Sequence, residues 1–567
     1  MRRSFLIFIG IFLLIPLSLL AQSPLLPPSH PVYDFLDRMD AAGAVESPLI
    51  GCKPLNRVRI AQLLDEAYEQ AQEFPGRLSR SDRKLLAAYR WEFARDLHRA
   101  GISSAEAPHP DETSRLSNIN DWMSDHNWFT EVFYRNGINF YSQETEEFDV
   151  YFDPRGIARI ISQENESEPI IITSVGLTVR GQALDKLGLY IDVMDYTESG
   201  RSPYNTRTKL YEDRFGYVAL EDEAETANYD IANFDLAVGG SFWELHAAKM
   251  PLRWGPGRSG QLLLSDWGTS FHQAQMGLYL GKHLRFVYVF GSLKTEPEIV
   301  DTLYENGGYY RTIEANKFIA AHRLEWDPHR RLRFGFSEAV IFGDREPELA
   351  YLIPVNLFYS AQHALGDEDN TVMGIDASWI VRDGWKVYGE LLIDDISFGK
   401  LGSDFWGNKL GWLGGVYTVN PFNLPDIDLT LEVSQLRPYI YTHQYYVNVY
   451  SHWTSPLGYR YPPNSQTFYM NLGYRPHWRW DIDASWTHFE HGANTAELNA
   501  GGDIFTSKVN DTSEDAPFLG GDLQISNRFD LQSSYRLLLG LDLWARGSLC
   551  QFGGDDAFEW EFGFRWN

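Results

Sequence analysis

The residues best suited to chemistry begin with a short motif rich in arginine, tryptophan and glycine near the middle of the chain. Residues 253–258 read Arg-Trp-Gly-Pro-Gly-Arg, and Trp267 follows soon after. Gly-Pro-Gly forces a tight reversal, because glycine permits positive φ and proline fixes its own. The reversal would place the guanidinium groups of Arg253 and Arg258 near the Trp254 indole, a combination that binds carboxylate or hydroxyl groups and stacks on the C–H face of a sugar. The alternative, which the residue types alone favour, is a structural turn containing a cation–π pair.

A second cluster combines tyrosine, histidine and tryptophan with serine and asparagine between residues 437 and 458. Flat apolar faces beside hydrogen-bonding groups are typical of sites that bind small polar ligands such as carbohydrate. An aromatic girdle at a membrane interface, next to an ordinary loop, would have the same composition. Both interpretations stay open for its candidate residues, which are Tyr439, Tyr441, His443, His452 and Trp453.

Support for catalysis is weaker. Adjacent acids occur at Asp394-Asp395 and at Asp555-Asp556, but such pairs arise by chance in a chain this rich in acids. Glycoside hydrolysis needs two carboxyl groups about 5–9.5 Å apart in a cleft, which neighbours in sequence do not show. The chain lacks Gly-x-Ser-x-Gly, His-Glu-x-x-His and phosphate-cradling motifs, and its histidines lack ligand spacing. We therefore predict no catalytic residue, no metal site and no cofactor.

The start of the chain indicates export. Arg2 and Arg3 precede an apolar run from Phe5 to Leu20, and Ala21 offers a small residue for cleavage, so we expect a signal peptide over residues 1–21. No later apolar run is long enough for a membrane-spanning helix. The chain has 77 acidic against 49 basic residues and a formal charge of −28. This balance argues against nucleic acid as a partner, because phosphates need a basic surface.

Residues 22–120 are predicted to form a small helical bundle followed by a linker. Apolar residues recur at helical spacing in three segments, near residues 32–39, 60–71 and 85–97. Gly43 is placed to end the first helix, Asn56 to cap the second, and Gly101 to stop the third. The polar, proline-containing segment 102–120 is the expected linker, and a periplasmic location is expected for the whole region.

From residue 121 to residue 567 the apolar period changes to two. The final segment is the clearest example, with aromatic residues at 558, 560, 562, 564 and 566 alternating with polar residues and glycine. A lipid-facing wall with a wet interior accepts this pattern, and closure leaves no unpaired strand edge in the hydrocarbon. With strands of about 10 residues, this region suits about 16–20 of them. We predict a mainly β protein, a transmembrane antiparallel barrel with a small N-terminal α-helical bundle.

Two further features bear on this prediction. Cys52 and Cys550 are the only cysteines. They belong to the bundle and to the outer end of the penultimate strand, so we expect no disulfide between them, because bridged Cα atoms lie within about 7 Å. Among the longest apolar segments is Tyr351–Tyr359, which has the length of a strand and contains a proline.

Several of these segments resemble the Wzi capsule-assembly family. The resemblance rests on residues 253–257 with the Leu262–Ser265 segment that follows, and on the opening helix, His30–Leu36. Degenerate matches at residues 388–395, 437–439 and 456–458 resemble the Bacteroidetes branch. This chain has Arg253-Trp254 where relatives often carry two tryptophans, and Tyr459-Arg460 where a histidine is common. The resemblance implies an 18-stranded outer-membrane barrel whose periplasmic end is closed by the helical bundle.

The resemblance also implies a non-catalytic, lectin-like role in binding or anchoring a surface (capsular) polysaccharide and assisting capsule assembly. Expected partners are this polysaccharide and outer-membrane lipid, with the protein monomeric. A chain this acidic repels a polyanionic glycan unless divalent cations or local arginines intervene, so a neutral or zwitterionic glycan is easier to accommodate. The alternatives are an outer-membrane carbohydrate or solute channel, which predicts conductance, and an outer-membrane enzyme acting on glycan or lipid, which predicts turnover.

Overall fold

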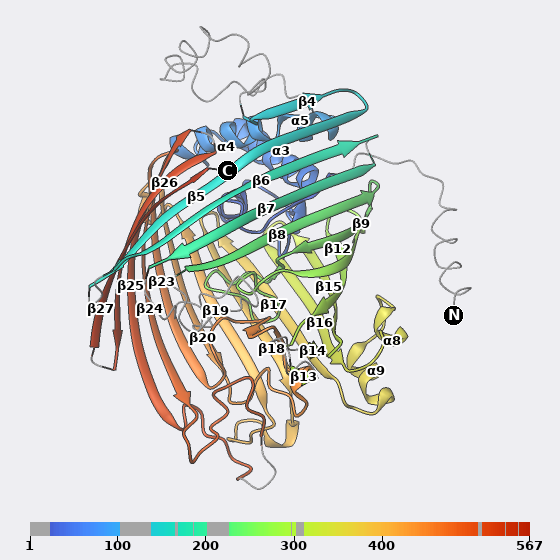
Figure 1. The fold of residues 1–567 in the computed structure, drawn as a ribbon. Coiled ribbons are helices and arrows are strands. Elements are labelled where there is room, and N and C mark those ends of the chain that lie inside the picture. Colours follow the sequence, from blue (N-terminus) through green and yellow to red (C-terminus); the bar gives the residue numbers. More distant parts are fainter. Residues whose placement is uncertain are drawn as a thin grey trace.

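Strands with alternating apolar and polar side chains form the wall of a closed barrel in the computed structural model (Figure 1). The structure describes residues 23–102, 138–164, 168–184, 186–200, 226–295, 298–301, 311–313, 315–508, 513–538, 540–553 and 555–566. The predicted signal peptide and most of the predicted linker lie outside these residues. Among the described helices, none has the length and apolar character needed to span a membrane.

Within the described residues, 18 antiparallel strands close the barrel, and the pairing of the last strand with the first completes the ring. This confirms the predicted fold class and the strand number. The strands are β5 (Phe148–Gln163), β6 (Ile170–Ala183), β7 (Leu187–Ser199), β8 (Thr226–Gly239), β9 (Trp243–Met250), β11 (Phe271–Tyr279), β12 (Leu284–Leu293), β15 (Lys317–His329), β16 (Leu332–Gly343), β17 (Asn370–Arg382), β18 (Trp385–Asp395), β19 (Lys409–Val419), β20 (Ile427–Leu436), β23 (Ser465–His477), β24 (Trp480–Ala493), β25 (Asp522–Leu538), β26 (Leu541–Phe552) and β27 (Asp555–Trp566). A short strand, β4 (Tyr141–Glu144), extends the sheet beside β5.

The two faces of the wall differ as the sequence alternation predicts. On β27, Phe562 is 55% exposed on the outer face, whereas the neighbouring Glu561 is 6% exposed. On β18, Val387 and Leu391 face outward and Glu390 faces inward and is buried. The outer face is therefore apolar around the barrel, and the carboxyl groups lie in the interior.

The two ends of the barrel also differ (Figure 1). At one end the strands are joined by short turns, such as residues 383–384, and the N-terminal helices lie there; we call this the bundle end. At the other end, the loop end, the connections are long. They include residues 251–270, 344–369 and 437–464.

Residues 23–102, the part of the N-terminal region that the structure describes, contain four helices where the sequence predicted three. They are α2 (Val32–Ala41), α3 (Arg57–Glu73), α4 (Arg80–Glu92) and α5 (Ala94–Arg99). Asn56 caps α3 as predicted, since its side chain accepts from the Arg59 N–H at 2.8 Å. The predicted third helix is divided at Phe93 into α4 and α5, and α4 begins with a capping box on Ser79.

Ion pairs fix the bundle to the barrel interior. Asp40 of α2 accepts from Arg333 of β16 at 2.7 Å and from Lys386 of β18 at 2.9 Å. At the opposite side, Asp149 of β5 accepts from Arg95 and Arg99 of α5. Buried pairs of this kind hold two elements in one relative position, because moving the elements apart would separate the charges and leave each one buried without compensation.

The connection between β16 and β17 folds back over the outer wall. It contains α8 (Leu349–Leu352) and α9 (Phe358–Leu365), so the apolar segment Tyr351–Tyr359 forms parts of two helices and no strand. Tyr351 packs against Phe342 of β16 and accepts, through its carbonyl, from the Tyr288 hydroxyl at 2.7 Å. Cys52 and Cys550 are not joined by a disulfide.

Candidate functional site

The motif at residues 253–258 belongs to a connection that folds into the barrel. This segment, residues 251–270 between β9 and β11, is called the inward loop below. Its strand β10 (Arg253–Trp254) pairs with β2 (Cys52–Lys53) of the N-terminal segment. The Gly255 N–H donates to the Gly51 carbonyl at 2.8 Å, so the loop reaches the bundle and is joined to it by backbone hydrogen bonds.

The N-terminal segment carries a compensated charge pair where the loop meets it. The Lys53 ammonium lies 2.9 Å from the Asp37 carboxylate. Burial alone would raise the pKa of Asp37, but the attraction of Lys53 outweighs it and holds that pKa well below its usual value. The strand of the inward loop at residues 253–254 therefore pairs with a segment whose Lys53 side chain is fixed by an ion pair.

Two glutamates of the barrel wall hold the tip of the inward loop. Glu390 of β18 accepts from the backbone N–H groups of Gly257 at 2.7 Å and Leu262 at 2.8 Å. Glu432 of β20 accepts from those of Arg258 at 2.6 Å and Ser259 at 2.7 Å. Four backbone donors thus end on two carboxyl groups, which fixes the loop without using its side chains.

Glycine is required at this contact. The backbone of Gly255 has a φ of +129°, a conformation that side chains other than glycine rarely adopt. A Cβ atom there would also lie 2.4 Å from the Glu390 carboxyl group. The Gly-Pro-Gly sequence is therefore needed for the close approach of loop and wall, in addition to the reversal that the sequence predicts.

A second connection covers the inward loop. Residues 437–464, between β20 and β23, contain the tyrosine-rich cluster. The Tyr441 hydroxyl donates to the Leu262 carbonyl at 2.5 Å, and the Tyr450 hydroxyl donates to the Leu263 carbonyl at 2.8 Å. The hydroxyl groups of Tyr459 and Ser259 lie 2.9 Å apart. These tyrosines hold the two connections together inside the lumen.

A cavity of about 220 Å³ lies between the two connections and the wall. Arg253, Arg258 and Trp267 of the inward loop line it, so the structure brings three of the predicted site residues together. Arg460 lines the same cavity, with its guanidinium carbon 4.5 Å from the centre of a Trp267 ring. We call this space the arginine cavity. It combines guanidinium groups, an indole and hydroxyl groups, the chemistry expected for a polar, ring-shaped ligand.

The other predicted residues lie elsewhere. Trp254 is 1% exposed and packs in the main apolar cluster; Tyr439 and Tyr441 are also buried, and the Tyr439 hydroxyl donates to the Asn499 carbonyl at 2.7 Å. His452 is buried and accepts from the Lys294 N–H at 2.9 Å. His443 and Trp453 are half-buried within the same connection. These six do not line the arginine cavity, and their contact with a ligand stays a prediction.

Burial controls the protonation of the two histidines in this connection. Loss of hydration lowers the pKa of His452 to about 3, and it lowers the pKa of His443 to about 4. Lysine charges near each ring act in the same direction. Both rings are therefore neutral at physiological pH.

Sequence reasoning did not identify Arg460 and Tyr461 as site residues. In the sequence, Arg460 stands out only because relatives commonly have a histidine near this position. The signal that could have identified it is an arginine flanked by two tyrosines, after the Pro456-Leu457-Gly458 turn. Glu390 and Glu432 lie on strands in which apolar and polar residues alternate. This alternation predicts that their side chains face the interior, but it does not show which backbone N–H groups they bind.

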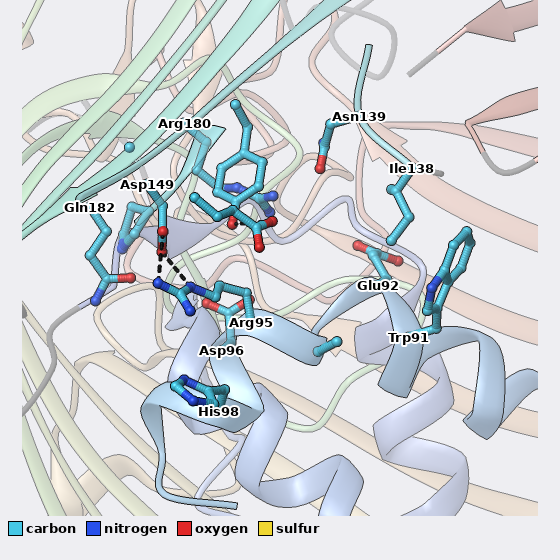
Figure 2. A pocket seen from close by; sticks show the side chains of 15 residues that line it. Trp91, Glu92, Arg95, Asp96, His98, Ile138, Asn139, Asp149, Arg180 and Gln182 are labelled. Carbon is cyan, nitrogen blue, oxygen red and sulfur yellow. Dashed lines mark hydrogen bonds and ion pairs between the residues drawn. The ribbon is translucent and has the colours of Figure 1, made fainter. Parts of the chain in front are cut away.

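A different cavity, of about 270 Å³, lies at the bundle end between helices α4 and α5 and strands β5 and β6 (Figure 2). Figure 2 shows Arg95 pointing at Asp149, and Arg180 lies beside them. This cavity contains none of the predicted site residues, and the Asp149 contacts there attach the bundle. In the part of the chain that the structure describes, no group of three or more metal-ligating side chains is placed to hold a metal ion.

These features define the class of protein. A closed strand wall with an apolar outer face and charged groups inside is a transmembrane β-barrel of the outer-membrane type, and here a helical bundle and folded-in loops occupy its interior. The sequence profile of the family "Capsule assembly protein Wzi" matches residues 163–504. The chain belongs to this family, which confirms the resemblance drawn from the residues.

One solved structure agrees with this fold at a TM-score above 0.5. The outer membrane protein Wzi of Escherichia coli, described as a carbohydrate-binding β-barrel involved in group 1 capsule assembly, is similar with a TM-score of 0.54 and 13% identity, over 96% of this chain and 99% of that one. OccK5 (OpdH) of Pseudomonas aeruginosa has a TM-score of 0.40 and 9% identity, over 74% and 97% of the two chains. OccAB2 of Acinetobacter baumannii has a TM-score of 0.42 and 9% identity, over 74% and 97%. No curated protein matches the chain. The protein is an outer-membrane barrel.

Proposed function

We propose that this protein binds a surface polysaccharide at the loop end of its barrel and helps to hold or assemble it as a capsule, without catalysing a reaction. The observation that carries the proposal is the arginine cavity, whose Arg253, Arg258, Trp267 and Arg460 lie between two connections that wall residues hold in place. A rigid cavity binds a ligand without first having to order its own loops. The carbohydrate-binding description of the Escherichia coli protein supports the same role.

The interior favours this role over that of a channel. The bundle is attached to the wall through Asp40 and Asp149, and the inward loop pairs with the bundle. These contacts occupy the lumen where a solute would pass. The proposal further includes a periplasmic position for the bundle, a monomeric protein, and outer-membrane lipid against the apolar wall.

Binding of the host's own polysaccharide tests the proposal. The protein, purified in detergent, is titrated with surface polysaccharide extracted from the host strain, and the heat of binding is measured. We expect saturable binding by the wild-type chain. A folded protein that binds no surface polysaccharide of its host would overturn the proposed function.

A further inference from the structure

Three arginines that line the arginine cavity have no carboxylate partner. Arg253, Arg258 and Arg460 form no ion pair with any residue that the structure describes. Each guanidinium has five N–H donors. Among the described residues, the three guanidinium groups make one hydrogen bond between them, from Arg460 to the Tyr461 hydroxyl at 2.7 Å. The Nε atoms of Arg253 and Arg460 are buried with no acceptor. The cavity thus holds three cations with almost all of their donors unused.

Most other arginines of the interior are paired. Among the described residues, Arg180 and Arg565 form no ion pair either, but they line a different cavity at the bundle end. Most of the remaining arginines of the wall and the bundle each have a carboxylate partner. Examples are Arg285 with Glu244 at 3.1 Å, Arg323 with Asp376 at 2.5 Å and Arg155 with Asp192 at 2.5 Å. In a chain with an excess of acids, carboxylates are available throughout the lumen. None of the carboxylates that the structure describes is within ion-pair distance of the three neighbouring arginines, although Asp266, Asp34 and Asp37 attract two of them from further away, and this leaves a local site for an anion.

The surroundings of the arginines complete the site. Aromatic rings position two of the guanidinium groups, since Arg258 lies 4.2 Å over Tyr417 and Arg460 lies over Trp267. One acid, Asp266, lines the cavity with them, so positive charge is in excess but limited. The volume of about 220 Å³ is below the several hundred Å³ of typical ligand pockets. It suits a single small residue with one negative charge.

We infer that the arginine cavity binds a sugar residue that carries a carboxylate, as in a uronic acid, with Arg253, Arg258 and Arg460 as the partners of that carboxylate. This inference rests on the proposed function and names the chemical class of its ligand. A planar guanidinium matches a carboxylate through two parallel hydrogen bonds. The site also explains how a chain of net charge −28 can accept an acidic glycan, because repulsion is relieved where the ligand binds.

The test compares one polysaccharide in two forms. Surface polysaccharide from the host strain is used as extracted and after its carboxyl groups have been reduced to alcohols with carbodiimide and borohydride. We expect the reduced form to bind the wild-type protein about tenfold more weakly or worse, because charge-assisted hydrogen bonds are lost. Arg460→Gln should weaken binding of the native form by a similar factor and leave binding of the reduced form unchanged. Arg382→Gln, at an exposed turn of the bundle end, removes the same charge and should change neither.

The outcomes separate this inference from the proposed function. Equal binding of the two forms, or a bound polysaccharide without carboxylates, overturns the inference and leaves the proposed function standing. Binding of neither form by the folded wild-type protein overturns both. A shift of the barrel band between unheated and boiled gel samples shows that Arg460→Gln and Arg382→Gln are folded. A folded Arg460→Gln protein with wild-type affinity for the native form also overturns the inference.

Discussion

Replacing Glu432 should release the tip of the inward loop. Its side chain is 2% exposed and accepts from the backbone N–H groups of Arg258 and Ser259 and, at 2.5 Å, from the Tyr388 hydroxyl. Glu432→Ala leaves these three donors without an acceptor inside the barrel. An unsatisfied buried donor costs about 1–3 kcal/mol, and water entering the space left by the side chain replaces part of the loss. We expect the free energy of unfolding to fall by about 3–5 kcal/mol.

Two measurements test this prediction, one of stability and one of polysaccharide binding. Guanidinium unfolding, followed by tryptophan fluorescence, gives the loss of stability, and calorimetry gives the affinity for host polysaccharide. Because Glu432 positions the backbone of Arg258, the affinity should fall together with the stability. Glu432→Gln should have an intermediate effect, since its amide oxygen still accepts but its NH₂ group faces a second donor.

A glutamate elsewhere on the wall supplies the control. Glu559 of β27 also faces the interior and accepts from Gln163 at 2.9 Å, but it contacts no part of the inward loop that the structure describes. Glu559→Ala removes the same charge and should leave polysaccharide affinity unchanged. If Glu432→Ala is no less stable than Glu559→Ala and binds as tightly, the wall glutamate does not hold the loop and this reasoning is wrong.

Three further perturbations test other parts of the structure. Asp40→Asn leaves Lys386 without a carboxylate and Arg333 with Asp327 alone, which should cost about 3–5 kcal/mol and loosen the bundle. Planar-bilayer conductance should rise, and unchanged conductance would contradict the proposal that the bundle blocks the lumen. Since burial lowers the pKa of His452 to about 3, below its unfolded value of about 6.5, the unfolded chain binds the extra proton and the connection loses stability as pH falls below about 6.5. Protease protection at pH 7 and pH 5 should show this loss in the wild type and a smaller loss in His452→Gln, in which only the half-buried His443 of this connection still contributes. Trp254→Ala empties a core position and should cost about 3–5 kcal/mol in guanidinium unfolding, with a loss below about 1 kcal/mol placing the indole outside the core.

Much of the fold could be predicted, because it depends on local patterns. A strand in a membrane barrel alternates between lipid and lumen, so the aromatic residues of β27 and the inward glutamate of β18 are recognisable without knowledge of their neighbours. The same holds for Asn56, whose cap depends on the next three residues. The division of the third helix at Phe93 has no equally clear signal, since the apolar spacing continues through it.

The parts that could not be predicted depend on contacts between distant residues. Segment Tyr351–Tyr359 has the length and apolarity of a strand, but its place outside the wall depends on packing against β12 and β16. Arg253, Arg258 and Trp267 were found because they are close in sequence. Arg460 is about two hundred residues away, and only the fold brings it to the same cavity.

The aromatic cluster shows a different limit. Tyrosines that hold a loop and tyrosines that bind a sugar have the same composition in sequence, because both need a flat ring and a hydroxyl group. In this chain Tyr441 and Tyr450 donate to carbonyls of the inward loop, and Tyr439 donates to a neighbouring loop. The many tyrosines in this part of the sequence are therefore explained by their role in holding loops inside the lumen, and they do not by themselves indicate a ligand site.

Retention of polysaccharide by living cells tests the central claim most directly. The gene is deleted in the native host and restored in wild-type form, and surface polysaccharide is measured separately on the cells and in the medium. If the barrel holds polysaccharide at the cell surface, the deletion should move it from the cells to the medium and the restored gene should return it. An unchanged distribution in the deletion strain would contradict the account.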